Sequence, residues 1–300
     1  MGGRDDDLVM SFKHIGISQI HPPEQILSNV SGYVARGCIT AVMGASASGK
    51  SVFMRALTGR ALNLRVSGEV LIEGMVVDQS DISNSVAYVP QDDILMGELS
   101  AREMLRNAAA MKRNKPMAVI DTDVERLLSI LGLHDVADNP IGTAFVRGLS
   151  GGQKKRVNIG AELVAAPLVL FLDEPTSGLD ASIAYTVVNS IRDIVKSSDG
   201  KLSLILSIHQ PNSRILELFD HILLLGGGAM SFFGTVSESI EYFTSIGFPP
   251  PPDYAPTDFF LHVTDTNFGA HTDLNFDGMY HLPVLSELIM LRREFLNQFY

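Results

Sequence analysis

The chain has 300 residues, of which 46% are hydrophobic and 19% are charged, and its formal net charge is −11. This composition is typical of a globular chain with a sizeable core, and the excess of acidic residues argues against nucleic-acid binding, which favours basic surfaces. The single cysteine excludes an internal disulfide, and no run reaches the roughly 18 apolar residues of a membrane-spanning helix.

The predicted elements begin with strands. Segments 8–15, 26–34 and 67–77 have strand-like patterns separated by turns, which favours antiparallel pairing. Several later apolar runs are short and bounded by polar residues, as is typical of strands buried on both faces of a parallel sheet. These runs are 38–43, 85–89, 168–172, 204–208 and 221–225.

A helical segment separates the second and third of these buried strands. Residues 100–113 mix leucine and methionine with alanines and charged residues, which favours a helix. Thr122 and Glu125 have the spacing of a capping box, which predicts that another helix starts there. We therefore expect a helical subdomain, 92–165, inserted into an α/β fold with a mostly parallel sheet.

A phosphate-binding motif follows the first buried strand. The pattern G-x-x-x-x-G-K-[ST] lies between that strand and a helical segment, which is the context that a P-loop requires. Backbone N–H groups of such a loop point at phosphates, Lys50 reaches the β- and γ-phosphates, and the Ser51 hydroxyl binds Mg²⁺. A glycine-rich turn without a ligand is the alternative interpretation. The expected ATP-binding residues here are Gly44, Ala45, Ser46, Ala47, Ser48, Gly49, Lys50, Ser51 and Val52.

Polar residues follow three of the other buried strands. Ligands of open α/β sheets bind beyond the carboxyl ends of the strands, so we expect these residues to share one edge of the sheet. A lone histidine is usually structural, but at this edge His209 is interpreted as a donor to the γ-phosphate. The residues at this edge are Gln91, Asp173, Glu174 and His209.

The two acidic residues have distinct expected roles. Asp173 would hold Mg²⁺ through water, and Glu174 would polarise the attacking water as general base. Adjacent side chains of a strand point to opposite faces, so both acids serve one site only if the strand ends at Asp173. Pro175 favours that ending.

The segment Leu149–Gln153 predicts the start of a helix that continues to about Val164. Ser150 and Gln153 have the spacing of a capping box, so a well-capped helix is the simplest interpretation. Such a start also offers free N–H groups and a positive dipole end to an anion. The glycines at 151 and 152 lack side chains that would block a phosphate.

Several segments together resemble the G, or White-type, subfamily of ABC transporters. The resemblance covers about residues 8–265 and implies an ATP-binding domain over that span. Its expected fold is a P-loop NTPase with a RecA-like, mostly parallel sheet, an N-terminal antiparallel β subdomain and the helical subdomain. The segments are VPQDDILMGELSAREML, GLSGGQKKRVNIGAELV, DEPTSGLDAS, SIHQPNSRILELFDHILLL and SFFGTVSESIEYFTSIGFPPPPDYAPTDFFLHV.

The resemblance implies roles for individual residues. Gln91 would sense Mg²⁺ and the attacking water and touch a membrane domain, Asp180 would contact a second subunit, and His209 would switch at the γ-phosphate. The implied catalytic residues are Glu174, His209 and Gln91, and the implied Mg²⁺ ligands are Ser51, Gln91 and Asp173. The signature residues expected to meet ATP across the dimer are Ser150, Gly151, Gly152 and Gln153.

The resemblance also implies partners. These are a second ATP-binding domain, identical or different, and a transmembrane domain C-terminal to this chain, with ATP and Mg²⁺ as cofactors. The domain would lie on the cytoplasmic face of a membrane and power export of a lipid-like or other hydrophobic substrate. Residues 266–300 are expected to form a linker and the amphipathic start of a connecting helix at the membrane surface. A helix packed on the domain is the alternative.

Two departures from the family pattern bear on the nucleotide. Ala47 stands where the family usually has glycine, and we expect it to be tolerated only if its φ is negative. Aromatic residues are missing near Ile20 and His21, where many relatives stack one on adenine, so GTP use is conceivable.

Three other classes of ABC ATPase fit the sequence less well. DNA-associated relatives insert a long coiled coil between P-loop and signature, and no heptad run is visible here. Soluble translation factors carry two cassettes in one chain, and this chain has one. A non-catalytic cassette is disfavoured by the presence of Glu174 and His209.

Overall fold

The structure is a computed structural model that describes residues 7–143, 145–247, 249–250 and 255–264. Ten strands form one sheet in the order β5-β4-β1-β2-β10-β9-β3-β8-β7-β6. The predicted amphipathic helix at 285–300 lies outside the described residues.

The N-terminal part of the sheet is antiparallel, as the sequence predicts. Strand β1 pairs with β2 on one side and with β4 on the other, and β4 pairs with β5. The strands β1 and β2 are longer than expected because their apolar residues continue to alternate with polar ones. Their bounds are Leu8–Gln19 for β1, Glu24–Ala35 for β2, Leu64–Ile72 for β4 and Met75–Val76 for β5.

The central part of the sheet is parallel, which confirms the predicted fold class. Strand β3 lies between β8 and β9, and β7 lies between β6 and β8. These strands are almost entirely buried, because helices cover this part of the sheet. Their bounds are Ile39–Met43 for β3, Val86–Val89 for β6, Val169–Leu172 for β7, Ser203–Ser207 for β8 and His221–Gly226 for β9. Strand β10, Ala229–Gly234, was not predicted and links β9 to β2.

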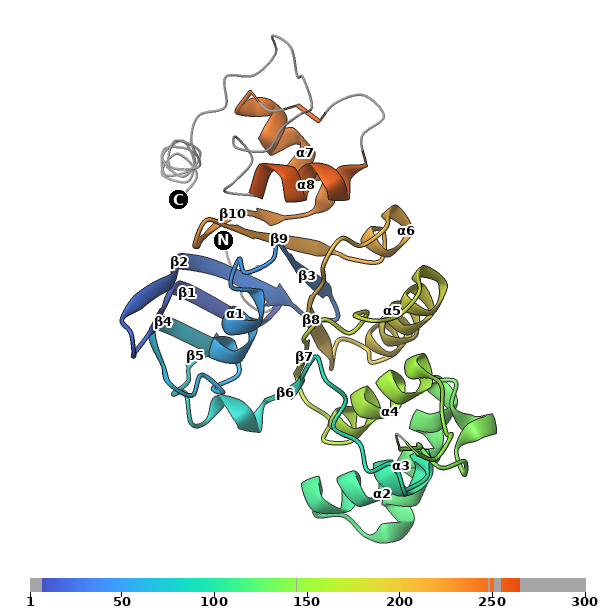
Figure 1. The fold of residues 1–300 in the computed structure, drawn as a ribbon. Helices are drawn as coiled ribbons and strands as arrows, with labels where there is room; N and C mark the ends of the chain where they lie inside the picture. The colour runs from blue at the N-terminus through green and yellow to red at the C-terminus, as the bar shows by residue number, and fades with distance from the viewer. Residues whose placement is uncertain (1–6, 144, 248, 251–254, 265–300) are drawn as a thin grey trace.

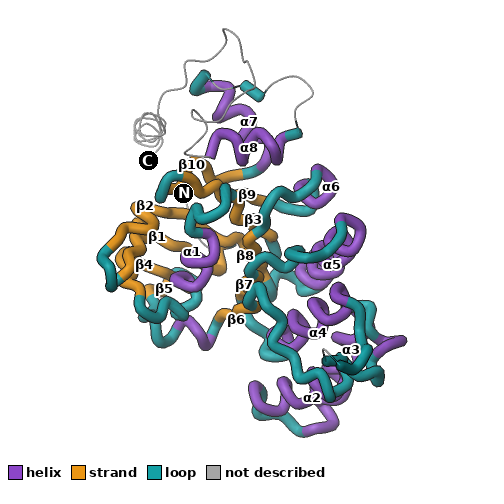
Figure 2. Tube along the Cα trace, in the orientation of Figure 1, coloured by secondary structure: helices purple, strands orange, loops and turns teal. Residues whose placement is uncertain are grey.

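Three helices form a lobe beside β6 and β7 (Figures 1 and 2). They are α2 (Ala101–Lys112), α3 (Met117–Ile130) and α4 (Gly151–Leu163), and a 3₁₀ turn η2 (His134–Val136) connects the last two. The other helices are α1 (Lys50–Leu57), α5 (Ala181–Lys196), α6 (Ser213–Leu216), α7 (Val236–Ser245) and α8 (Pro256–Thr264), with a 3₁₀ turn η1 at Ile82–Asn84.

Capping explains where α2 and α3 begin. The Ser100 hydroxyl accepts the Glu103 N–H, and the Glu103 carboxylate accepts the Ser100 N–H, so a capping box starts α2. The box predicted at Thr122 is wrong. Helix α3 begins after Pro116, and Thr122 lies inside it with its hydroxyl donated to the Ala118 carbonyl. The earlier start extends the apolar face of α3 by a turn.

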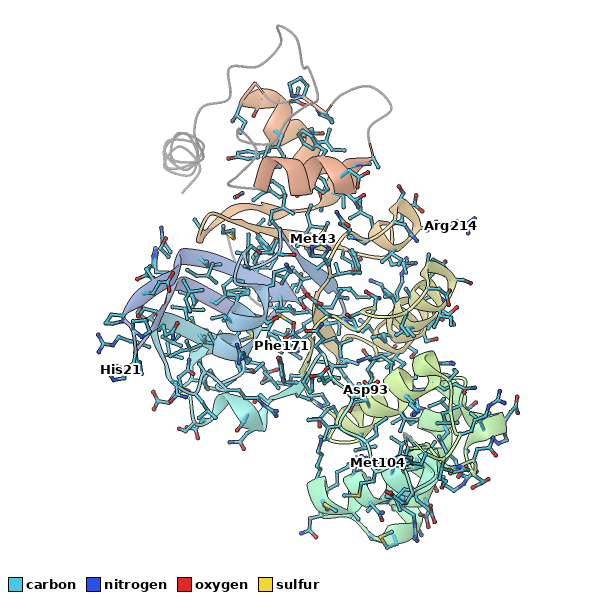
Figure 3. All side chains as sticks on the ribbon, viewed as in Figure 1. His21, Met43, Asp93, Met104, Phe171 and Arg214 are labelled. Atoms are coloured by element: carbon cyan, nitrogen blue, oxygen red, sulfur yellow. The ribbon has the colours of Figure 1, made fainter. Side chains whose placement is uncertain are left out.

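The core lies on both faces of the sheet. One cluster joins the helical lobe, α5 and α8 to alternate residues of the parallel strands, including Met43 (Figure 3). The other joins α1 and the antiparallel strands to the remaining residues, including Phe171. The central strands are therefore packed between two apolar layers. Because such packing is dense, the sheet is rigid and fixes the positions of the loops at the strand ends.

Candidate functional site

The ends of four parallel strands meet at one edge of the sheet. The register pairs Val89 with Leu172 and Leu172 with Leu206, and β3 runs parallel to β8. The residues that follow these strands therefore emerge side by side, as the sequence predicts. They are the loop 44–49, Gln91, Asp173, Glu174 and His209.

The loop between β3 and α1 is tightly shaped. Gly49 has φ 93° and caps α1, a conformation that side chains disfavour. A Cβ at Gly44 would clash with the Leu225 carbonyl oxygen, so only glycine fits there. Lys50 is 5% exposed, and its Nζ donates to the carbonyls of Gly44 and Ala45, each at 2.9 Å. The loop thus curls around a buried ammonium group.

The electrostatic surroundings of Lys50 combine burial with two nearby carboxylates. Burial lowers the pKa of Lys50, while the nearby carboxylates of Glu174 and Asp173 raise it. In the described part of the chain, Ser48 Oγ is buried in the same loop without a hydrogen-bond partner. A buried hydroxyl without a partner is costly, and a phosphate oxygen would satisfy it. The loop therefore fits the phosphates of a nucleotide.

Ala47 has a backbone conformation that alanine disfavours. Its φ is 63°, in the left-handed region, so the negative φ under which alanine was expected to be tolerated is absent. The Ser48 N–H donates to the Ala45 carbonyl at 3.2 Å and closes a turn around Ala47. The Ala47 side chain is exposed, so the cost is a local clash with its own backbone.

We expect Ala47→Gly to raise the free energy of unfolding by about 0.5–1 kcal/mol. Relief of about 1–2 kcal/mol of left-handed strain outweighs the greater unfolded-chain entropy of glycine, about 0.4–1 kcal/mol. Urea denaturation would measure the change. Ala45→Gly is the matched control, because Ala45 has no positive φ, and it should lower stability. Equal effects of the two substitutions would contradict this account.

The Asp173 carboxylate is held on both oxygens. Oδ1 accepts the hydroxyls of Ser51 at 2.9 Å and Ser207 at 2.6 Å, and Oδ2 accepts the hydroxyl of Tyr88 at 2.8 Å. Burial raises the pKa of Tyr88, and its hydrogen bond to Asp173 raises it further. The hydroxyl therefore stays protonated as a donor. The oxygens of Ser51 and Asp173 are the hard ligands that Mg²⁺ prefers, so the residues present fit this ion.

The Glu174 side chain turns toward Gln91. Strand β7 ends at Leu172, and Glu174 has φ 44°, which changes the chain direction immediately after Asp173. Gln91 Nε2 donates to Glu174 Oε2 at 3.0 Å and to Ser177 Oγ at 3.3 Å. This turn brings both acids to the same edge of the sheet, with β7 ending at Leu172 as the predicted strand 168–172 does. Their joint role in one site stays a prediction.

His209 joins the same group through the loop. Its Nε2 lies 3.2 Å from Ser46 Oγ, and which atom donates depends on the tautomer. His209 follows β8 after Ile208. Because β8 and β3 are parallel neighbours, His209 lies beside the phosphate-binding loop that follows β3. A nucleotide seated in the loop would lie within reach of the imidazole ring.

The signature segment begins α4 as predicted. The Ser150 hydroxyl accepts the Gln153 backbone N–H, and the side-chain Oε1 of Gln153 accepts the Ser150 N–H, so the two residues form a capping box. Gly152 has a packing reason that the sequence did not reveal. A Cβ there would lie 2.5 Å from Ile183 Cγ2. Gly151 is exposed and its hypothetical Cβ meets Leu179 at 3.4 Å, so this position is open.

Helix α4 is tied to the Gln91 loop. Lys155 is 4% exposed and donates to the Gln91 carbonyl at 2.8 Å and to Asp93 Oδ1 at 2.7 Å (Figure 3). Asn158 Nδ2 also donates to Asp93 Oδ1, at 3.1 Å. A buried cation with two partners fixes the loop to the helical lobe. Displacement of the lobe would therefore be transmitted to Gln91.

Two predicted groups are not gathered at this edge within one chain. The signature segment begins a helix of the lobe beside β6 and β7, and Asp180 caps α5 by accepting the N–H groups of Ser182 and Ile183, each at 3.0 Å. The capping role of Asp180 was not foreseen. Its contact with a second subunit stays a prediction.

The sequence analysis missed three residues of the site. Tyr88 and Ser207 lie in predicted strands, and Lys155 lies in the predicted signature helix. A signal was present for Ser207, because a hydroxyl within an apolar strand needs a partner, whereas Lys155 lies in the polar run 153–156 and gave no such signal. The partners themselves depend on the strand order.

Comparison with protein families supports this geometry. The profile described as "ABC transporter" matches residues 27–177, just over half of the chain, and the profile described as "ABC-2 type transporter" matches residues 209–293. The first range contains the loop 44–51, Gln91, the signature segment and both acids. The second begins at His209.

Similar proteins carry G-subfamily names. ABC transporter G family member 11 of Arabidopsis thaliana is 42% identical over 248 residues, and a broad substrate specificity ATP-binding cassette transporter of Rattus norvegicus is 39% identical over 249 residues. Each alignment covers 82% of this chain but only 35% and 37% of the relatives. The chain therefore spans about a third of the length of these relatives.

Solved structures share the fold. The protein cbiO1 of Clostridium perfringens, part of an ABC transporter complex, has a TM-score of 0.68 at 25% identity, covering 80% of this chain and 93% of that one. The ADP conformation of MJ1267, an ATP-binding cassette, has a TM-score of 0.64 at 22% identity, covering 79% of this chain and 95% of that one. The chain therefore belongs to the ABC transporter family, with relatives in its G subfamily, and it shares the fold of ATP-binding cassettes.

Proposed function

We propose that this chain powers ABC-type transmembrane transport by binding ATP between two copies of its ATPase domain and hydrolysing it with Mg²⁺. The observation that carries the proposal is a set of hydrogen-bonded residues at the edge of the sheet. Lys50 donates to the Gly44 carbonyl in the loop, Ser51 donates to Asp173, and Gln91 donates to Glu174. Each of these parts has a role in phosphoryl transfer.

The loop and Asp173 would hold the nucleotide and the metal ion. Lys50 gives the loop a buried positive charge, and backbone N–H groups of the loop and of α1 would bind phosphate oxygens. Ser51, Gln91 and Asp173 are the proposed Mg²⁺ ligands, and Asp173 would act through water. The ion supplies neutralisation of the phosphate charge that develops during transfer.

Glu174 is the proposed general base. Its carboxylate lies one residue beyond the proposed metal ligand, and Gln91 orients it through a hydrogen bond of 3.0 Å. A positioned carboxylate can accept the proton of an attacking water. His209 would donate to the γ-phosphate, since its Nε2 lies 3.2 Å from Ser46 Oγ in the phosphate-binding loop.

A second copy would complete the site. The P-loop lies at the central strands, while the signature segment begins a helix of the lobe that contacts β6 and β7 (Figure 1). Backbone N–H groups at the start of α4 suit an anion, and Gly151 leaves that start open. We propose that the signature of each copy, together with Asp180, closes on the ATP held by the other.

The transport role rests on the family and its G-subfamily relatives. In the part of the chain that the structure describes, no helix has the length and apolar character needed to cross a bilayer. We propose that a transmembrane domain, joined to this domain or assembled with it, carries the substrate, with the ATPase domain on the cytoplasmic face. A hydrophobic or lipid-like substrate moved by export is the proposed class. The name of the rat relative includes a broad substrate specificity for that protein.

We expect ATP to dimerise the chain when Mg²⁺ is removed, because binding without hydrolysis keeps the closed pair. Light scattering with ATP, with ADP and without nucleotide would measure the change. Gly151→Asp should abolish the ATP effect, because it sets a carboxylate against the phosphates. Ala118→Asp is the control, because it adds a carboxylate at an exposed position in the first turn of another helix of the lobe, α3. A chain that binds ATP and stays monomeric at high concentration would contradict the paired site.

A further inference from the structure

Ser207 stands between the two acids of the site. It is the last residue of β8 and has no exposed surface. Its Oγ donates to Asp173 Oδ1 at 2.6 Å and accepts the Glu174 N–H at 2.8 Å. One hydroxyl therefore touches the carboxylate of the proposed metal ligand and the backbone of the proposed base.

The strand register explains this position. Strands β7 and β8 are parallel, and Leu172 pairs with Leu206, so Ser207 lies beside Asp173 one residue further along. A serine hydroxyl has one proton to donate and lone pairs that accept. The Ser207 hydroxyl donates its proton to Asp173 and accepts the Glu174 N–H with a lone pair. These two hydrogen bonds fix the orientation of the hydroxyl.

The bond to Glu174 acts on a strained residue. Glu174 has φ 44°, a left-handed conformation that a glutamate rarely adopts without support from its surroundings. The accepted N–H bond restrains the backbone at this turn, and the turn directs the side chain to Gln91. Loss of the bond would let the turn relax and move the carboxylate.

Asp173 has a second restraint that does not involve Glu174. Tyr88, on the neighbouring strand β6, donates to Oδ2 at 2.8 Å, and the Arg60 guanidinium lies over its ring at 5.5 Å from the centroid. Tyr88 therefore restrains the carboxylate of Asp173, whereas Ser207 restrains both acids. The two residues can be separated by experiment.

We propose that Ser207 is a positioning residue for ATP hydrolysis, whose hydroxyl fixes the Asp173 carboxylate and the left-handed turn of Glu174 relative to each other. The proposal rests on the hydrolytic function proposed above. Ser207 need not touch the nucleotide. It acts through Asp173 on the metal ion and through Glu174 on the attacking water.

The test compares Ser207→Ala with Ser203→Ala in the full chain. Ser203 lies in the same strand and is also fully buried. Its hydroxyl accepts the Gly37 N–H at 3.0 Å and bonds to neither acid. We expect Ser207→Ala to lower kcat by about 10–100-fold, because displaced catalytic groups and lost outer-shell partners cost this much. The KM for ATP should stay close to that of the unmodified chain, because the loop 44–51 is intact.

A second measurement does not use turnover. The affinity for Mn²⁺ in the presence of ADP, followed by electron paramagnetic resonance, should fall for Ser207→Ala and for Tyr88→Phe, since both lose a restraint on Asp173. Only Ser207→Ala should add the loss of the Glu174 turn, so its kcat should fall further than that of Tyr88→Phe. If Ser207→Ala does not fold, Ser207→Cys replaces it, because its thiol fills the site and is a weaker hydrogen-bond donor.

The outcomes separate the two proposals. If the unmodified chain hydrolyses ATP and Ser207→Ala lowers kcat no further than Ser203→Ala, the positioning role is overturned while the function stands. Equal losses of kcat in Ser207→Ala and Tyr88→Phe would overturn the link to Glu174. If the unmodified chain neither binds nor hydrolyses ATP, the function itself fails.

Discussion

Glu174→Gln is expected to lower the rate of ATP hydrolysis by about 10²–10⁴-fold, the usual contribution of a general base. ATP should still bind and still dimerise the chain, because the loop, Lys50 and Ser51 are unchanged. Glutamine keeps the shape of glutamate, and its carbonyl oxygen can still accept the hydrogen bond that Gln91 donates at 3.0 Å. The variant therefore removes the proton acceptor and leaves the geometry.

Single-turnover hydrolysis and equilibrium binding of ATP would measure this separation. Glu217→Gln is the control, because Glu217 is exposed at the end of α6, outside the set of hydrogen-bonded residues at the edge of the sheet. It should behave as the unmodified chain. Hydrolysis at an unchanged rate in Glu174→Gln would exclude Glu174 as the base, and loss of ATP binding would show that its carboxylate has a structural role in the site.

Lys50→Ala is expected to weaken ATP binding by about 100-fold or more. Two charge-assisted hydrogen bonds to phosphate oxygens contribute about 1.5–3 kcal/mol each, and about 1.4 kcal/mol is tenfold in Kd. The loss has a second cause. Without the ammonium group, the carboxylates of Asp173 and Glu174 face the phosphates with no buried cation between them.

Titration with a fluorescent ATP analogue would measure the loss, and circular dichroism would show whether the fold is retained. Lys201→Ala is the control, because Lys201 is exposed in the turn before β8. Equal affinity in Lys50→Ala and the unmodified chain would mean that backbone N–H groups alone hold the phosphates. Together, the two variants separate loss of ATP binding from loss of the proton acceptor, since only Lys50→Ala should weaken ATP binding.

The structure changes the interpretation of two glycine-related positions. Ala47 has φ 63° and not the negative value under which alanine was expected to be tolerated, so the loop carries local strain there. Gly152 was read as an opening for phosphate, yet its absent Cβ also makes room for Ile183. The sequence shows which residue occupies each position. The backbone conformation and the neighbouring side chains show which structural constraint that residue meets.

The sequence by itself determined the fold class and the chemical groups of the site. The P-loop pattern, the acids after a buried strand and the signature capping box depend on neighbouring residues in the chain, so local rules reach them. The same rules failed at Thr122, because the start of α3 depends on Pro116 and on packing against α2.

Only the tertiary structure decided which residues restrain the acids. Tyr88 and Ser207 lie in strands that are buried on both faces, and such strands give no periodicity to show where a side chain points. The order β8-β7-β6 places one on each side of Asp173, and it follows from how the apolar layers pack over the whole sheet. Contacts between strands that are far apart in the sequence depend on that packing. Local sequence patterns therefore do not predict which strands become neighbours.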